Sequence, residues 1–132
     1  MKIEIFEGTD KRLYEQLVPL VMNPAVLRQN NNVAFKTSEK HTWILAIDGE
    51  ECIGFLPVQR KKSCAEVNNY YIRGRAKKVF AELLARAESW AKSMDYTTIV
   101  VITQIEDRGV LGRRKYTASK EYVKYIKFAK EL

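Results

Sequence analysis

The sequence predicts a mixed α+β (α/β) fold, with a mostly antiparallel twisted sheet that is flanked by helices and carries a parallel strand pair at its centre. Four predicted elements follow one another in the middle of the chain: a strand over 65–72, a basic turn, an amphipathic helix over 77–93 and an apolar strand over 97–103. That order requires a crossover, which makes the two strands parallel neighbours. Asp48-Gly49 separates two apolar runs and predicts an antiparallel hairpin. At 132 residues the chain is expected to form one domain, 1–132.

The N-terminal third predicts a strand, two helices and a loop. Residues 2–6 alternate as a strand does, and Thr9 or Asp10 can cap the helix that follows. Pro19 makes this helix irregular, and Asn23-Pro24 ends it and starts a short second helix through Leu27 or Arg28. The apolar face of the first helix consists of Leu13, Leu17, Leu20 and Val21. The weakly patterned stretch to Lys40 predicts a loop.

The middle of the chain predicts a three-strand meander that leads into a helix. The hairpin strands span 42–47 and 52–58, and Pro57 indicates that the second strand ends, bulges or lies unpaired there. Residues 60–63 form a basic turn into the third strand. The helix that follows has one apolar stripe at a period of 3.6 residues, made by Val79, Phe80, Leu83, Leu84, Ala87, Trp90, Ala91 and Met94.

The C-terminal part predicts a central strand, a short helix and a final strand. Residues 99–102 are apolar on both faces, as in a central parallel strand. Gly109 and Gly112 mark a short irregular helix. The tail 121–130 is ambiguous: Tyr122, Tyr125, Ile126 and Ala129 fit a helix face, whereas its Tyr, Val, Ile and Phe content favours a strand. We choose a strand, mainly on the resemblance given below.

The basic turn before the helix predicts an anion site. Free N–H groups at a helix start and the helix dipole attract anions, and Arg73, Arg75, Lys77 and Lys78 surround Gly74 here. Residues 1–66 hold 9 basic and 9 acidic side chains, whereas residues 67–132 hold 14 and 7, so the whole excess of +7 lies in the second half. A phosphate-bearing ligand is the first inference. A solvated basic surface and a turn that only starts a helix are the plainer alternatives.

Several classes of protein are not expected. There is no run near 18 apolar residues, and the N-terminus lacks the apolar region of a signal peptide, so we expect a cytoplasmic protein without a membrane span. Cys52 and Cys64 are expected to be free thiols. No metal site is expected, because His41 is the single histidine and no Cys/His cluster exists. His41 itself is expected to have a structural role.

The order of elements resembles that of the GNAT superfamily of N-acyltransferases. The hairpin 43–58, the unit 71–90 and the ending 125–132 carry the likeness, which covers nearly the whole chain. The resemblance implies transfer of an acetyl or other acyl group from acetyl-CoA or another acyl-CoA to a primary amine. It also implies that the two central strands splay apart beside Ile102 and Thr103, and that the pantetheine arm pairs with strand 65–72.

The same resemblance names the residues that hold the cofactor. The family turn reads Gln/Arg-x-x-Gly-x-Gly/Ala, and its amides bind the CoA pyrophosphate. One register places Gly74 and Ala76 on the small positions, with Tyr71 where Gln or Arg is usual; the other begins at Arg73 and places Ala76 and Lys78 there. The implied cofactor-binding residues are Tyr71, Ile72, Arg73, Gly74, Arg75, Ala76, Lys77 and Lys78, with Tyr71 and Ile72 nearest the thioester.

The resemblance also suggests catalytic residues. Amine attack on a thioester needs a base, and Glu66 stands on the strand where family members can carry a carboxylate. An ordinary solvent-facing role is the alternative for Glu66. The family tyrosine that protonates the thiolate falls on Leu111, so Tyr116 or Tyr70 is the candidate to replace it.

Two further readings remain open. A non-catalytic nucleic-acid-binding module is suggested by lysines interleaved with aromatics at Tyr122, Lys124, Tyr125, Lys127 and Phe128, which equally suit a core strand. A GNAT fold without activity is the other. The sequence does not distinguish a monomer from a homodimer.

Overall fold

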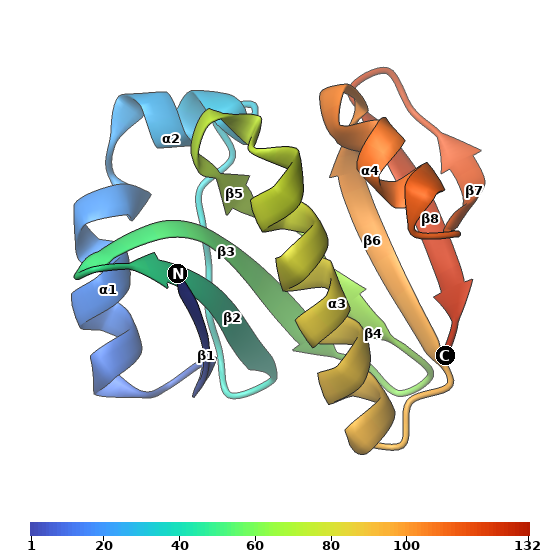
Figure 1. Cartoon of the computed structure of the whole chain (residues 1–132), viewed down its shortest axis with the longest axis horizontal. Helices are drawn as coiled ribbons and strands as arrows, with labels where there is room; N and C mark the ends of the chain where they lie inside the picture. The colour runs from blue at the N-terminus through green and yellow to red at the C-terminus, as the bar shows by residue number, and fades with distance from the viewer.

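The structure, a computed structural model, describes residues 1–132 as one central sheet with helices on both faces (Figure 1). The elements in chain order are β1 (Lys2–Glu7), α1 (Lys11–Val21), α2 (Pro24–Gln29), β2 (His41–Asp48), β3 (Glu51–Arg60), β4 (Ala65–Val67), β5 (Tyr71–Ile72), α3 (Lys77–Ser93), β6 (Thr98–Gln104), α4 (Arg108–Arg113), β7 (Thr117–Glu121) and β8 (Tyr125–Glu131), with 3-10 turns at Arg73–Arg75 and Ile105–Asp107.

The strands lie in the order β1-β2-β3-β4-β6-β8-β7, and β5 pairs with β3 beside β4. Every pair is antiparallel except β4 and β6, which are parallel. The mixed, mostly antiparallel fold with a central parallel pair is therefore confirmed. None of the helices combines the length and the apolar character needed to cross a membrane.

Two hydrophobic cores lie on opposite faces of the sheet. The larger core packs α3 and α4 against one face, through residues such as Phe80, Leu84 and Leu111. The smaller core packs α1 and α2 against the other face, through Leu13 and Val26. Burial on both faces explains the near-continuous apolar sequence of β2 and β6.

Local sequence signals determine most element ends. The Asp10 side chain accepts a hydrogen bond from the Arg12 N–H and caps α1, and Asn23 caps α2 in the same way from the Ala25 N–H. Helix α3 spans the 77–93 range that its apolar stripe predicted. Gly49 has φ 62° in the β2–β3 hairpin, a conformation that glycine adopts without a Cβ penalty.

Two expectations about strands need correction. The strand expected over 65–72 is divided into β4 and β5, because residues 68–70 leave the sheet. β7 was not predicted as a strand, since its five residues are all exposed and show no alternation. It forms only because β8 offers it a neighbour at the sheet edge. The predicted strand in the tail is confirmed as β8.

Both cysteines are free, as expected. Burial raises the pKa of the Cys52 thiol to about 11, so this thiol stays protonated at neutral pH.

Candidate active site

A β-bulge breaks the strand that leads into the basic turn. β4 pairs with β3 up to Val67, which lies opposite Val58, and β5 resumes the pairing at Tyr71, which lies opposite Phe55. Four steps from Val67 to Tyr71 therefore face three steps from Val58 to Phe55, so one residue is extra. Asn69 adopts a left-handed conformation with φ 56° within this bulge.

Pro57 lies in β3 opposite the bulge. It is aligned with Trp43 of β2 on one side and has no aligned partner on the other. Proline has no N–H to donate, and here no neighbouring strand requires one. The strand therefore continues through Pro57, which pairs with β2 and is unpaired only on the side of β4 and β5.

The bulge separates two strands that begin as parallel neighbours. β6 pairs with β4 only up to Val101, which lies opposite Val67. Its remaining residues, 102–104, pair with β8 alone, whereas β5 pairs with β3 alone. The strands thus part beside Ile102 and Thr103, where the resemblance placed the opening (Figure 1). We call the interruption of the sheet between β5 and residues 102–104 of β6 the gap.

Tyr70 reaches from the bulge to the end of β6. Its ring stacks on Phe80 of α3 with a centroid distance of 4.7 Å. Its hydroxyl donates to Asp107 Oδ2 at 2.6 Å and accepts from the Gln104 N–H at 3.0 Å. Burial, followed by the Asp107 charge, raises the pKa of Tyr70 well above its usual value. Tyr70 therefore closes the α3 side of the gap as a neutral phenol.

Arg75 crosses to the same group of residues from the basic turn. Its guanidinium donates to Gln104 Oε1 at 2.8 Å and to Asp107 Oδ2 at 3.1 Å, and it lies 3.6 Å from Glu106. Both Gly74 and Arg75 have positive φ, 59° and 50°, and this turn directs the Arg75 side chain across the gap. One cation of the turn is therefore already partnered by acidic side chains.

The wall of the gap contains two unpartnered polar atoms. Thr103 Oγ1 and Gln104 Nε2 are buried and form no hydrogen bond. Gln104 is 1% exposed, so water does not compensate freely for the missing partner. A polar ligand in the gap could satisfy these atoms.

The N-terminus of α3 is open to solvent at the end of the gap. Ala76 is the N-cap residue, no side chain caps the helix, and the first helical bond runs from the Phe80 N–H to the Ala76 carbonyl. The N–H groups of Lys77, Lys78 and Val79 are therefore the unpaired donors of the first turn. Both lysine side chains are exposed and form no ion pair.

The other predicted turn residues have different roles. Arg73 pairs with Glu51 at 3.2 Å, and the Ala76 N–H donates to the Arg73 carbonyl at 3.3 Å. The side chains of Tyr71 and Ile72 belong to the two hydrophobic cores, so only their backbones can meet a ligand. The structure thus brings the unpaired main-chain amides at the start of α3 together with two free lysines, Lys77 and Lys78.

Glu66 lines a polar pocket of about 210 Å³ on the α2 side of the sheet. Its carboxylate lies 2.9 Å from Lys61 Nζ, and the side chain is 16% exposed. His41 lines the same pocket; burial, followed by Arg60, lowers its pKa, so the imidazole is neutral at pH 7. Asn68 and Asn69 form the wall toward the bulge. This pocket places a carboxylate and a neutral imidazole beside the break in the sheet.

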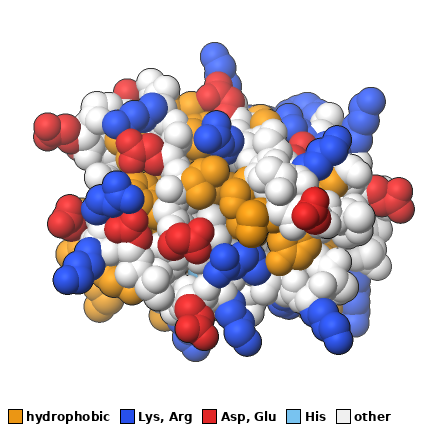
Figure 2. All heavy atoms as spheres, turned by 90° about the horizontal axis from the view of Figure 1, so that it is seen from below, with side chains coloured by type: hydrophobic (Ala, Val, Ile, Leu, Met, Phe, Trp, Pro, Cys, Tyr) orange, Lys and Arg blue, Asp and Glu red, His pale blue; other side chains and the backbone are white.

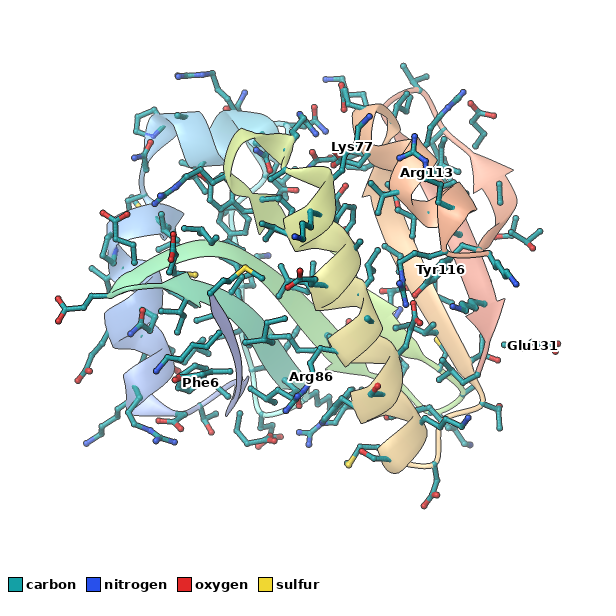
Figure 3. The ribbon with its side chains drawn as sticks, viewed as in Figure 1. Phe6, Lys77, Arg86, Arg113, Tyr116 and Glu131 are labelled. Atoms are coloured by element: carbon teal, nitrogen blue, oxygen red, sulfur yellow. The ribbon has the colours of Figure 1, made fainter.

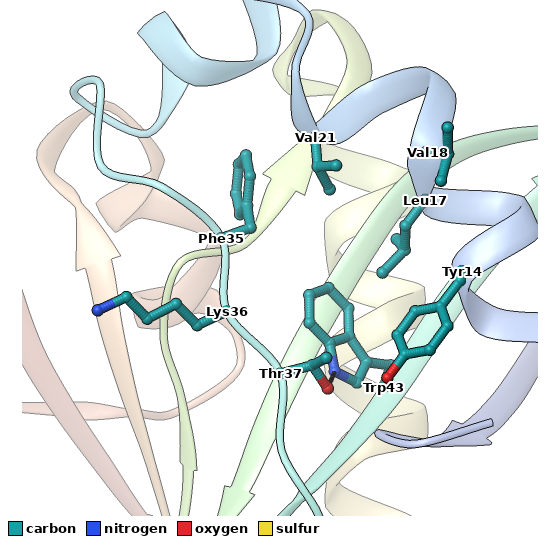
Figure 4. A pocket seen from close by; sticks show the side chains of 8 residues that line it. All are labelled: Tyr14, Leu17, Val18, Val21, Phe35, Lys36, Thr37 and Trp43. Carbon is teal, nitrogen blue, oxygen red and sulfur yellow. Dashed lines mark hydrogen bonds between the residues drawn. The ribbon is translucent and has the colours of Figure 1, made fainter. Parts of the chain in front are cut away.

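An apolar pocket of about 200 Å³ lies between α1 and the loop before β2 (Figure 4). Its polar wall atoms are satisfied internally, because Trp43 Nε1 donates to Thr37 Oγ1 and Thr37 Oγ1 donates to the Gly8 carbonyl. Lys36 points away from it. The pocket can therefore hold only an apolar group.

Tyr116 lies away from the gap. Its hydroxyl donates to Glu88 Oε2 at 2.9 Å, and Figure 3 shows it beside the middle of α3, whereas Lys77 stands at the start of that helix. Burial, followed by Glu88, raises the pKa of Tyr116 far above its usual value. The structure does not bring Tyr116 together with Glu66 and the basic turn; Tyr70 is the tyrosine at the gap.

The lysine- and aromatic-rich tail is largely a core strand. Phe128 and Ile126 are buried in the larger core, and Tyr122 is the exposed aromatic of this segment. In β8 the buried face carries Ile126 and Phe128, while Tyr122 and Lys124 precede the strand.

Three residues at the gap had no signal of their own in the sequence. Gln29, Gln104 and Asp107 contact the turn or the strands that flank the gap over long sequence separations. Asp107 follows the predicted central strand, and an acidic residue just after such a strand is the one pattern that could have indicated it.

The sequence matches no family profile and no curated protein. Solved structures match it over nearly its whole length. ElaA of Escherichia coli is 13% identical with a TM-score of 0.79, and the alignment covers 99% of this chain and 100% of ElaA. The aminoglycoside 6'-N-acetyltransferase of Enterococcus faecium is 14% identical with a TM-score of 0.70, covering 99% and 97%.

The N-acetyltransferase PseH of Campylobacter jejuni, whose structure is a complex with acetyl coenzyme A, is 12% identical with a TM-score of 0.66, covering 98% of this chain and 99% of PseH. The matches agree with the strand order, the parallel β4–β6 pair and the flanking helices described above. The chain has the fold of the GNAT superfamily of N-acetyltransferases.

Proposed function

We propose that the chain is an acyl-CoA-dependent N-acyltransferase that transfers an acetyl or other acyl group to a primary amine. One observation carries this proposal: two parallel strands part beside an open helix N-terminus that has two unpaired lysines. A sheet that separates at this point offers backbone groups for an extended ligand, and the helix start offers donors for its phosphates.

The residues present suit such a ligand. The amides of Lys77, Lys78 and Val79 and the two lysine side chains match a diphosphate in charge and donor number. The unpartnered Thr103 hydroxyl and Gln104 amide suit an arm that carries polar groups. Bound acyl-CoA would supply an activated thioester carbonyl.

Glu66 is the proposed base. The attacking amine must be neutral, and a new C–N bond forms as the C–S bond breaks and the thiol leaves. The amine proton passes to the Glu66 carboxylate, directly or through water, in the pocket beside the bulge. The departing thiolate takes a proton from water, and Glu66 returns the amine proton to solvent. Tyr116, which bonds Glu88, has no part in this arrangement.

Acetyl-CoA binding tests the proposal, with melting temperature and calorimetry as readouts. Ligand at 100 times its Kd should stabilise the fold by about 2.7 kcal/mol. The double variant Lys77→Glu/Lys78→Glu should weaken binding at least tenfold, because it reverses two charges at the phosphate site. Acidic residues favour a helix N-terminus, so lost stability would not explain the lost binding.

Lys40→Glu/Lys62→Glu is the matched control. These exposed lysines lie near the opposite end of β3 and bring the same change in net charge. The control should bind acetyl-CoA within about twofold of the wild type at moderate salt. Absence of binding to the wild-type chain by any acyl-CoA would refute the proposal.

A further inference from the structure

The side chain of Gln29 covers part of the gap. Gln29 is the last residue of α2, and its carboxamide forms two hydrogen bonds with one residue of β5. Its Oε1 accepts from the Ile72 N–H at 2.9 Å, and its Nε2 donates to the Ile72 carbonyl at 2.8 Å. A secondary amide on a neighbouring strand would use the same two groups.

These two groups of Ile72 face the gap. In an antiparallel pair, alternate residues direct their N–H and C=O toward the partner strand and away from it. Since both groups of Ile72 bond Gln29 and not β3, they point to the other edge of β5. That edge faces the end of β6, which pairs with β8 on its other side, and an extended ligand would enter the sheet between the two strands.

The helix that carries Gln29 is lightly attached. α2 has six residues, and Val26 is its one buried side chain. The next residue, Asn30, bonds Asn69 of the bulge at 3.2 Å, and Asn31 and Asn32 then both adopt positive φ. Few buried contacts mean that such a segment can open at low cost in free energy.

We propose that Gln29 is a displaceable plug, which holds the β5 edge in the free protein and yields it to the amide-bearing arm of acyl-CoA. This inference rests on the proposed function. The exchange replaces donor by donor and acceptor by acceptor, so the backbone of Ile72 is satisfied in both states. Because only open molecules can bind, the apparent affinity for acyl-CoA equals the affinity of the open form multiplied by the fraction of molecules that are open.

The variant Gln29→Ala distinguishes a displaceable plug from a residue that only supports the fold. It should bind coenzyme A about tenfold more tightly than the wild type, because two competing hydrogen bonds are gone. At the same time the free variant should melt about 3–5 °C lower. A residue that only supports the fold would weaken both properties together.

Two controls sharpen this test. Adenosine 3'-phosphate 5'-diphosphate, the nucleotide half of coenzyme A, has no arm, so its affinity should be equal in the two proteins. Asp10→Ala removes the cap of α1, a helix that carries neither Gln29 nor a contact to Ile72. It should lower the melting temperature and leave the affinity for coenzyme A within about threefold of the wild type.

Hydrogen exchange of the Ile72 amide gives a second readout that needs no catalysis. The amide should exchange slowly in the free wild type, faster in free Gln29→Ala, and slowly again when coenzyme A is added to the variant. An amide that coenzyme A fails to protect in the variant overturns the plug.

The failures are distinguishable. If coenzyme A binds the wild type and Gln29→Ala equally well, the plug is wrong and the proposed function stands. If coenzyme A binds neither protein, the plug falls together with the proposed function.

Discussion

At the scale of residues, the proposed acyl transfer rests on individual side chains of the polar pocket. Glu66 and His41 are the two groups there that can accept a proton, and both lie beside the bulge. Their neighbours differ: Lys61 pairs with Glu66, whereas Ser38 Oγ lies 2.8 Å from His41 Nδ1. The proposed reaction assigns the proton to Glu66, and His41 is the alternative acceptor in the same pocket.

Glu66→Gln should lower kcat for acyl transfer about 100-fold or more, because an amide cannot accept the amine proton. The Kd for acetyl-CoA should not change, since Glu66 does not contact the phosphate site. Thiol release in the presence of an amine measures the rate. Glu50→Gln, an exposed hairpin residue, is the control for the lost charge. A large loss in His41→Gln with full activity in Glu66→Gln would assign the base to His41.

At the scale of elements, the short turn between β5 and α3 connects the strand edge to the helix amides. Gly74 has φ 59°, and a Cβ placed on it would meet nothing within 4 Å. Gly49 in the β2–β3 hairpin has φ 62° and is equally open. The two glycines are therefore matched in backbone strain and in free space, but only Gly74 adjoins the proposed phosphate site.

Gly74→Leu and Gly49→Leu should each destabilise the fold by about 1–2 kcal/mol, the cost of a side chain in the left-handed region. Only Gly74→Leu should also weaken acetyl-CoA binding, because its side chain would stand over the open amides of α3. Urea denaturation and calorimetry measure the two effects. Equal acetyl-CoA affinity in both variants would show that ligand does not approach this turn.

The whole molecule consists of two sheet halves that share few strand contacts. β4 and β6 pair over only three residues each, so α3 must hold the C-terminal half in place from outside the sheet. Glu88 of α3 makes this link: its carboxylate accepts from Arg114 at 2.8 and 3.1 Å, from Tyr116 at 2.9 Å and from Lys130 at 3.1 Å. Lys130 belongs to β8 and therefore connects the helix to the far half.

Glu88→Gln should destabilise the protein by about 2 kcal/mol at pH 7, because it leaves a partly buried guanidinium and ammonium without their anion. Burial opposes ionisation of Glu88, but bonds from Arg114, Lys130 and Tyr116 outweigh it and lower its pKa below the ordinary 4.5. The stabilisation is therefore present above pH 4.5 and is lost as the pH falls through the lowered pKa.

Urea denaturation at pH 7 and at pH 3 measures this difference. The difference in unfolding free energy between the wild type and Glu88→Gln should be smaller at pH 3 than at pH 7. Glu82→Gln, on the same helix and without an ion pair, should differ little from the wild type at either pH. A difference that persists unchanged at pH 3 would contradict the assigned role of the carboxylate.

One face of the molecule carries a mixture of basic and acidic side chains. Figure 2 shows the face at the lower edge of Figure 1, where Lys and Arg side chains alternate with Asp and Glu. On this face the charges are mixed, so the proposed anion site rests on the local arrangement at Lys77 and Lys78 and not on the net charge of +7.

Signals that act over a few residues determined what the sequence alone could establish. Hydrophobic periodicity predicted the apolar stripe of α3 and the apolar run of β6. Turn chemistry predicted the Asp48-Gly49 hairpin, and capping predicted the helix starts at Asp10 and Asn23. These signals sufficed for the hairpin, the parallel pair and the position of the basic turn, but not for β7 or for the break between β4 and β5.

Tertiary structure decided where the sheet opens and what occupies the opening. No periodic pattern in the sequence marks the bulge at Asn69. The same holds for the Gln29–Ile72 pair and the Tyr70–Asp107 contact, whose residues lie far apart in the chain. Tyr116 met Glu88 instead of the gap for the same reason. A hydrogen-bond partner that lies 37 or 43 residues away is chosen by packing of the whole chain, because local sequence specifies conformation but not which distant surfaces meet.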